Sequence, residues 1–235
     1  MSKLTISAHD DSFGASISGV DLSSQLSAEE TQEIRKAWVK HRVVYFPDQP
    51  MNHDQLARFT LSFGGFGDDP YVKSIEEHQN ILEVRRDPDE DVAPFGGGWH
   101  SDWSFQETPP SATILHSKVI PPLGGDTWYA DGIAAYAALD PTTQSEIDDL
   151  ITIHSARRPY SHEGYLKSRG AERSMTILPN DSALQTQEHP MVRTHPESGE
   201  KVLWINLVYT LCVKGLSDSD SQSLLEHLFE HLLDE

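Results

Sequence analysis

His100 and Asp102 are the residues of this chain whose types and spacing point most directly to chemistry. One residue separates them, and side chains in a β-strand alternate between its two faces. If residues 100–102 form a strand, the imidazole and the carboxylate point the same way and can bind one metal ion. A glycine run at 96–98 precedes them and lets the backbone turn sharply. The pattern supplies two of the three ligands of a non-haem iron(II) facial triad.

A His-x-Asp triplet is common, so a surface histidine beside a solvated aspartate is the alternative interpretation. The sequence that follows favours the metal site. Residues 107–110 contain two prolines, an apolar strand is expected through 112–115, and residues 119–128 carry a Pro-Pro and a Gly-Gly pair.

These motifs resemble the taurine dioxygenase (TauD/TfdA) family of iron(II)/2-oxoglutarate oxygenases. The resemblance rests on their order and spacing, it extends to segments 43–47, 188–199 and 202–206, and it runs from about residue 5 to the end of the chain. It implies a mainly β fold with flanking helices, a double-stranded β-helix (jelly roll), in a single domain over residues 1–235.

The resemblance implies that His100 and Asp102 are iron ligands with catalytic roles. It also implies that the hydroxyl of Thr127 contacts a carboxylate of 2-oxoglutarate, although an ordinary strand residue after a Gly-Gly turn is the alternative. Tyr71 and Tyr160 lie where the family tends to place residues that contact substrate. The pair Arg157-Arg158 could meet a sulfonate or carboxylate, and exposed arginines on a lid are the alternative.

The implied reaction uses Fe(II), dioxygen and 2-oxoglutarate as co-substrate. It hydroxylates a small organic molecule, with a sulfonate or carboxylate as the expected class, and releases succinate and CO₂. Taurine itself is not favoured, because the glycines at 96–98 offer no polar side chain just before the metal motif.

The family also places a distal His ligand, and an Arg for 2-oxoglutarate, after a helix that here corresponds to the leucine-rich segment 224–233. The sequence stops at Glu235, so we expect a chain that is incomplete at its C-terminus and lacks the last jelly-roll strands. Spacing selects no internal histidine as a substitute among His116, His154, His189 and His195. The alternative function is therefore a catalytically inactive, truncated member that binds a small molecule or a protein.

A second motif, His227-x-x-Glu230-His231, matches the H-x-x-E-H pattern of inverted zinc peptidases. Leucines on the 3.6-residue period form the opposite face of the same predicted helix, so these polar residues are expected to face solvent.

The chain is strongly acidic, with 37 Asp and Glu against 18 Lys and Arg and a net charge of −19. This balance argues against nucleic-acid and anionic-membrane partners, which require basic patches. The single cysteine, Cys212, excludes an internal disulfide and fits a reducing compartment. We expect a cytoplasmic protein, and a homo-oligomer is compatible with the sequence.

Hydrophobic periodicity and turn residues predict the elements that must position the site. Helices are expected at 28–38, 52–61, 132–139, 142–150 and 224–233, and strands at 4–6, 15–20, 43–46, 81–84 and 151–154. The polar segment 157–187 is expected to be an ordered insertion or lid.

Overall fold

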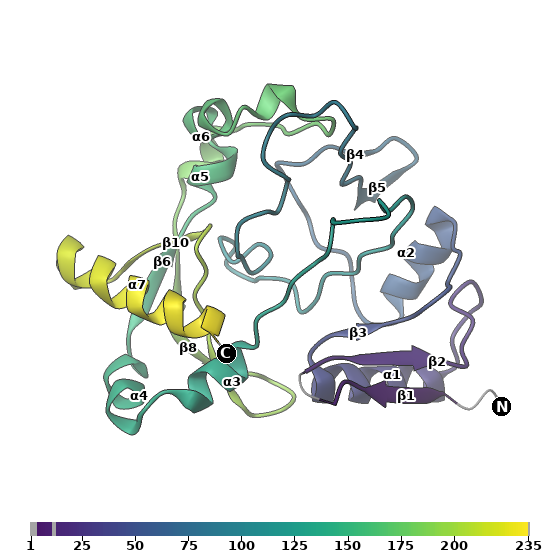
Figure 1. Ribbon diagram of the computed structural model, residues 1–235, viewed down its shortest axis with the longest axis horizontal. Coiled ribbons are helices and arrows are strands. Elements are labelled where there is room, and N and C mark those ends of the chain that lie inside the picture. The colour runs from purple at the N-terminus through teal and green to yellow at the C-terminus, as the bar shows by residue number, and fades with distance from the viewer. Residues whose placement is uncertain (1–3, 11–12, 235) are drawn as a thin grey trace.

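The fold was analysed in a computed structural model that describes residues 4–10 and 13–234 (Figure 1). Residues 1–3, 11, 12 and 235 of the predicted domain lie outside the described residues. The N-terminal strands and first two helices lie on one side of the molecule, and the C-terminal helix crosses the opposite side (Figure 1). Between them runs a long irregular segment.

A small sheet and two helices form the N-terminal region. Strands β1 (Thr5–Ala8) and β2 (Ala15–Ser18) pair antiparallel, and β3 (Val44–Tyr45) adds parallel to β2. Helix α1 (Ala28–His41) starts at a capping box in which Ser27 and Glu30 bond each other's backbone N–H groups. Helix α2 (His53–Leu61) follows, and the hairpin β4 (Ser74–Ile75) and β5 (His78–Leu82) contacts it. The predicted helices here are confirmed.

The C-terminal region is built on the sheet β10-β6-β7, formed by β6 (Ile151–His154), β7 (Gln187–Pro190) and β10 (Thr210–Val213). A second hairpin pairs β8 (Val192–Thr194) with β9 (Lys201–Leu203). Helices α3 (Gly132–Ala138), α4 (Pro141–Ile147) and α7 (Asp218–Asp234) accompany these strands. Their apolar faces close one buried core, which includes Ile147, Met191, Val213, Leu225 and Leu228.

The polar segment predicted as an insertion or lid is made of short helices. These are α5 (Arg157–Tyr160), α6 (His162–Lys167) and the 3₁₀ turns η1 (Gly170–Glu172) and η2 (Asp181–Leu184). Tyr160 and Ala183 are buried in a separate core cluster. The segment therefore contributes to the interior of the molecule as well as to its surface.

Residues 84–131 contain no helix or strand. The predicted strands at 100–102 and 112–115 are therefore wrong. A strand needs neighbouring backbone groups to complete its hydrogen bonds, and no ladder forms along this segment. Instead, Asp102 begins a turn in which the N–H of Gln106 donates to the carbonyl of Trp103 at 2.9 Å.

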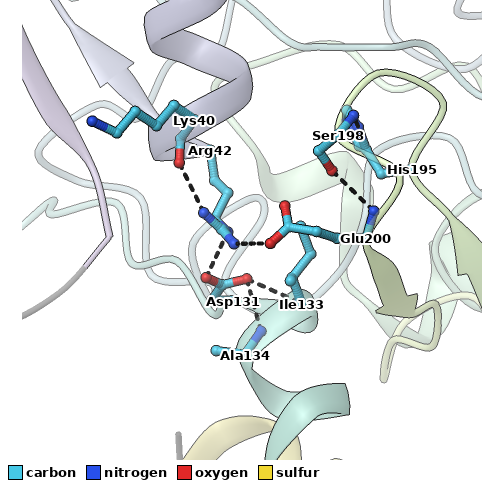
Figure 2. A network of polar contacts seen from close by, with 8 residues as sticks. All are labelled: Lys40, Arg42, Asp131, Ile133, Ala134, His195, Ser198 and Glu200. Carbon is cyan, nitrogen blue, oxygen red and sulfur yellow. Dashed lines mark hydrogen bonds and ion pairs between the residues drawn. The ribbon is translucent and has the colours of Figure 1, made fainter.

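The far end of this segment is fixed by an ionic network (Figure 2). Arg42, at the C-cap of α1, approaches Asp131 with an Nε–Oδ2 distance of 2.8 Å and Glu200 with an Nη2–Oε1 distance of 3.1 Å. The other oxygen of Asp131 caps α3 by accepting from the N–H groups of Ile133 and Ala134. The network therefore joins α1, α3 and the loop between β8 and β9.

The described strands form two three-stranded and two two-stranded sheets. The fold is thus sheet plus helix, and its strand pairing does not by itself establish the predicted jelly roll. None of the described helices is long and apolar enough to span a membrane.

Candidate active site

His100 and Asp102 converge even though they do not lie on a strand. Nε2 of His100 lies 3.1 Å from Oδ1 of Asp102, and the two side chains are 27% and 40% exposed. The alternation of a strand is therefore not what brings them together. The turn that starts at Asp102 folds the carboxylate back toward the imidazole, and the site remains open to solvent.

The second heteroatom of each group is already bonded. Nδ1 of His100 lies 2.7 Å from the carbonyl oxygen of Gly98, which can only accept, so Nδ1 carries the proton. Thr113 donates its hydroxyl to Oδ2 of Asp102 at 2.5 Å. When the imidazole is protonated on both nitrogens, Nε2–H donates to Oδ1 of Asp102. Once the Nε2 proton is lost, the Nε2 lone pair and Oδ1 face one position, while hydrogen bonds hold the outer atoms of both groups as they do for the ligands of metal sites.

The electrostatics match this pairing. The hydrogen bond to Asp102 raises the pKa of His100, with the Gly98 carbonyl adding to the effect against the opposing influence of burial. The hydrogen bond from His100 lowers the pKa of Asp102, and Thr113 lowers it further. Asp102 is therefore a carboxylate at neutral pH. A carboxylate and an imidazole are ligands that suit iron(II).

The turn that carries Asp102 is held on one side by Asp69. The indole N–H of Trp103 donates to Oδ2 of Asp69 at 3.0 Å, while Oδ1 accepts from the N–H groups of Tyr71 and Val72. Trp103 has a φ of 50°, in the left-handed region that disfavours side chains. Its ring lies against Gly67, where an added Cβ would be 2.1 Å from Cζ3. Only glycine fits there without displacing the indole.

Thr127 lies in the irregular segment, and its side chain is exposed. Tyr129, two residues further on, is half exposed. Burial, and then the charge of Asp102, raises the pKa of Tyr129, so the segment passes within electrostatic reach of Asp102. A role for Thr127 in binding 2-oxoglutarate stays a prediction.

Tyr71 and Tyr160 are stacked on each other, with ring centroids 4.8 Å apart and an interplanar angle of 12°. Both are buried, together with Phe105 and Tyr209, and Tyr209 lies edge-on to the ring of His100 at 6.1 Å. This aromatic cluster forms an apolar wall beside the candidate ligands. Tyr71 and Phe105 also border a pocket of about 250 Å³ whose other lining residues include Gln106, Ser182 and Gln187.

Arg157 and Arg158 bond backbone carbonyls. Arg158 donates through Nη1 to the carbonyl oxygens of Leu207 at 2.6 Å and Thr210 at 3.1 Å, and Arg157 donates to that of Leu184 at 3.1 Å. These contacts hold α5 against neighbouring loops. The two guanidinium groups therefore have a structural role.

Among the residues that the structure describes, no group of three or more His, Cys, Asp or Glu side chains could hold a metal ion. The histidines considered as substitutes all have other polar contacts, namely His116 with the Gln49 carbonyl, His154 with Thr152 and Ser104, His189 with the Gln106 carbonyl, and His195 with backbone N–H groups. The described residues thus fit two protein ligands of an iron centre.

The H-x-x-E-H motif lies on α7, as predicted, and His227 is exposed as expected. His231 is half-buried and contacts the carbonyl of Ala135 at 2.8 Å through Nε2. The expectation that it faces solvent is therefore wrong, because His231 links α7 to α3.

Several residues that shape the site were not predicted from the sequence, namely Asp69, Thr113, Ser104 and His154. Each acts through a contact with a residue distant in sequence, and no local motif signals such a contact. A faint signal existed for His154, because it ends a predicted alternating strand and a buried polar side chain requires a partner.

A His-x-Asp pair with bonded outer atoms beside an aromatic wall has the residue types expected of two ligands in a non-haem iron enzyme. The sequence pattern of the "Taurine catabolism dioxygenase TauD, TfdA family" matches residues 4–235, and the chain belongs to this family.

Three related proteins illustrate the relationship. An "Alpha-ketoglutarate-dependent sulfate ester dioxygenase" of Pseudomonas putida is 34% identical over 94% of this chain and 71% of its own length. An "Alpha-ketoglutarate-dependent 2,4-dichlorophenoxyacetate dioxygenase" of Cupriavidus pinatubonensis is 33% identical over 93% of this chain and 78% of its own length. The crystal structure of AAD-2 in complex with Mn(II) and N-oxalylglycine superimposes with a TM-score of 0.73 at 28% identity, covering 98% of this chain and 80% of that one.

The chain spans only part of its curated relatives. Across eight of them the match covers from 52 to 78% of the relative's length. A relative from Schizosaccharomyces pombe, which carries a sulfonate dioxygenase name, is covered over 55%.

Proposed function

We propose that this protein is an iron(II)- and 2-oxoglutarate-dependent dioxygenase that hydroxylates a small organic substrate and releases succinate and CO₂. Family membership supports the reaction class, because the relatives named above are alpha-ketoglutarate-dependent dioxygenases. The sheets described here would then be parts of a double-stranded β-helix.

The observation that carries the proposal is the approach of Nε2 of His100 to Oδ1 of Asp102 at 3.1 Å. In the proposed site these two atoms would hold iron(II), which together with 2-oxoglutarate would supply the activation of dioxygen. The carbonyl of Gly98 keeps the imidazole in the tautomer with a free Nε2, and the hydroxyl of Thr113 keeps Oδ1 turned toward it. Neither ligand then needs to reorient when the metal binds.

The chain's remaining contributions are binding and exclusion of water. Tyr209 lies edge-on to His100, and Phe105 packs against Tyr209. Their apolar surface keeps water from one side of the reacting centre. In the proposal Thr127 donates its hydroxyl to a carboxylate of 2-oxoglutarate. Tyr71 and Tyr160 lie in the adjoining aromatic cluster and would contact the substrate.

The substrate class that we propose is a small sulfonate, sulfate ester or carboxylate. The names of the relatives support these classes, since one is a sulfate ester dioxygenase and another acts on an aryloxyacetate. Because the guanidinium groups of Arg157 and Arg158 bond backbone carbonyls, recognition of the anion is assigned to other donors.

A binding protein without activity is the second candidate. It is favoured by one observation, the lack of a third metal-ligating side chain near His100 and Asp102 among the described residues. Metal-dependent turnover separates the two candidates.

The test uses the full-length protein with Fe(II), 2-oxoglutarate and a panel of alkyl sulfonates, alkyl sulfates and aryloxyacetates. We expect succinate in amounts that match the hydroxylated or cleaved product, and loss of at least about 100-fold in the variants His100→Ala and Asp102→Ala. His227→Ala removes an exposed imidazole from α7 and should leave turnover unchanged. Succinate production that survives both ligand substitutions would refute the assignment, and metal binding without turnover would favour the binding protein.

A further inference from the structure

A buried chain of hydrogen bonds leads from the turn that carries Asp102 into the C-terminal sheet. Ser104 is fully buried two residues after Asp102. Its hydroxyl oxygen lies 2.9 Å from Nδ2 of Asn206 and 3.0 Å from Nδ1 of His154. The other ring nitrogen of His154 lies 2.9 Å from the hydroxyl of Thr152. Residues far apart in sequence thus meet at one serine.

The direction of every bond in this chain can be assigned from chemistry. The carbonyl of His189 only accepts, so Thr152 donates its hydroxyl proton there, at 3.1 Å. Thr152 therefore accepts from Nε2–H of His154, which leaves Nδ1 without a proton. Ser104 then donates to Nδ1 and accepts from the amide of Asn206. The chain fixes a neutral His154 in one tautomer, and each polar atom has a partner of the right kind.

The two residues that hold Ser104 are themselves rigid. His154 ends β6, the central strand of its sheet, and is paired with Thr210 on β10 and Gln187 on β7. The side chain of Asn206 also accepts the N–H of Tyr209 at 2.8 Å, so its amide cannot rotate freely. Because both partners are fixed, Ser104 has one position relative to the sheet.

We propose that Ser104, held by His154 and Asn206, is a positioning residue that keeps the carboxylate of Asp102 opposite His100 and thereby sets the affinity of the site for a divalent metal ion. The inference rests on the proposed function. The bond from Trp103 to Asp69 restrains the turn from the other side. The two residues that follow Asp102, at positions 103 and 104, are therefore both anchored. Loss of the Ser104 anchor frees the turn without removing a ligand.

The test measures Mn(II) affinity, with the metal alone, by electron paramagnetic resonance of the full-length protein. Ser104→Ala removes the anchor. Ser155→Ala is the matched control, because Ser155 is also fully buried and donates to a backbone carbonyl, that of Ala183 at 2.8 Å. Both variants lose a buried hydrogen bond, so both should melt at a lower temperature. Only Ser104→Ala should bind Mn(II) more weakly, by about tenfold.

His100→Ala separates this inference from the proposed function. If the unmodified protein does not bind Mn(II), or if His100→Ala binds it equally well, the metal site is wrong and the inference falls with it. If His100→Ala loses binding while Ser104→Ala keeps it, only the positioning role is overturned. Equal weakening in Ser155→Ala also overturns that role, since a general loss of stability would then explain the effect. Should Ser104→Ala fail to fold, Ser104→Cys, which preserves the size of the side chain, gives the same comparison.

Discussion

Two regions of the molecule, residues 84–131 and the residues from 132 onward, are ordered by different means. From residue 132 onward, strands pair, helices cover them, and one apolar core includes Ile147, Met191 and Leu228. Residues 84–131 carry the candidate ligands but contain no helix or strand. They are positioned by side chains that reach other elements, as Trp103 reaches Asp69 and Ser104 reaches His154.

Other side-chain contacts also attach the irregular segment to distant parts of the chain. Lys118 donates to the carbonyl of Met51 at 2.7 Å, and the guanidinium of Arg173 donates to that of Ala93 at 2.7 Å. Stability and site geometry therefore have separate sources in this molecule. Substitutions in the core should lower the free energy of unfolding, whereas substitutions at the anchors should change the metal site first.

The largest loss of stability is expected from Leu228→Ala. Leu228 lies on α7 with no exposed surface, and its truncation should lower the free energy of unfolding by about 3 to 5 kcal/mol. Urea denaturation checks the value. Leu233→Ala, on the same helix but 37% exposed, should cost less than about 1 kcal/mol. If Leu228→Ala lowers the Mn(II) affinity of the folded protein as much as His100→Ala does, stability and site geometry do not have separate sources.

Acid should lower the stability of the protein where the irregular segment meets the C-terminal sheet, at His154. Burial, followed by the charges of His189 and Arg193, lowers the pKa of His154 to about 3. The unfolded chain therefore binds a proton between about pH 6.5 and 3 that the folded chain does not, and stability falls as the pH falls through this window. At pH 4 the loss from this group is about 3 kcal/mol.

Chemical denaturation at pH 7 and pH 4 tests this value. His154→Gln cannot titrate, so it should lose about 3 kcal/mol less stability on acidification than the unmodified protein does. His227→Ala, which removes an exposed imidazole, should behave like the unmodified protein. An identical pH dependence in His154→Gln would show that His154 is not the group responsible.

A smaller effect on stability is expected from Gly67→Ala. The added Cβ would overlap the indole of Trp103, which must move and weaken its bond to Asp69. We expect a loss of about 1 to 3 kcal/mol, and Mn(II) affinity lower by about tenfold. Gly65→Ala is the control, because nothing lies within 4 Å of its Cβ position. Unchanged Mn(II) binding in Gly67→Ala would show that this anchor does not shape the site.

The sequence predicted those parts of the fold that rest on local signals. Periodicity and turn residues predicted helices at 28–38 and 52–61, which the structure confirms as α1 and α2. The alternation at 151–154 predicted β6. Family membership confirms the resemblance to the TauD/TfdA family. The pair His100 and Asp102 was found from its spacing, and its role as a pair of metal ligands stays a prediction.

What could not be predicted depends on contacts between distant residues. The strand expected at 100–102 was wrong because alternation gives no information about whether a neighbouring strand exists. Ser104, Asp69 and Thr113 became visible only once the turn was placed against its partners. The assignments of Thr127, Tyr71 and Tyr160 stay predictions, as do the single domain and the cytoplasmic location.

The contact between Arg42 and Asp131 has a consequence for the order of folding. It joins the end of the first long helix to the last residue of the irregular segment, across a long stretch of chain (Figure 2). Closing such a loop costs entropy that local structure cannot offset, so contacts of this kind form late. We therefore expect the helices and the C-terminal sheet to assemble first. The segment with the candidate ligands should acquire protection from hydrogen exchange only afterwards.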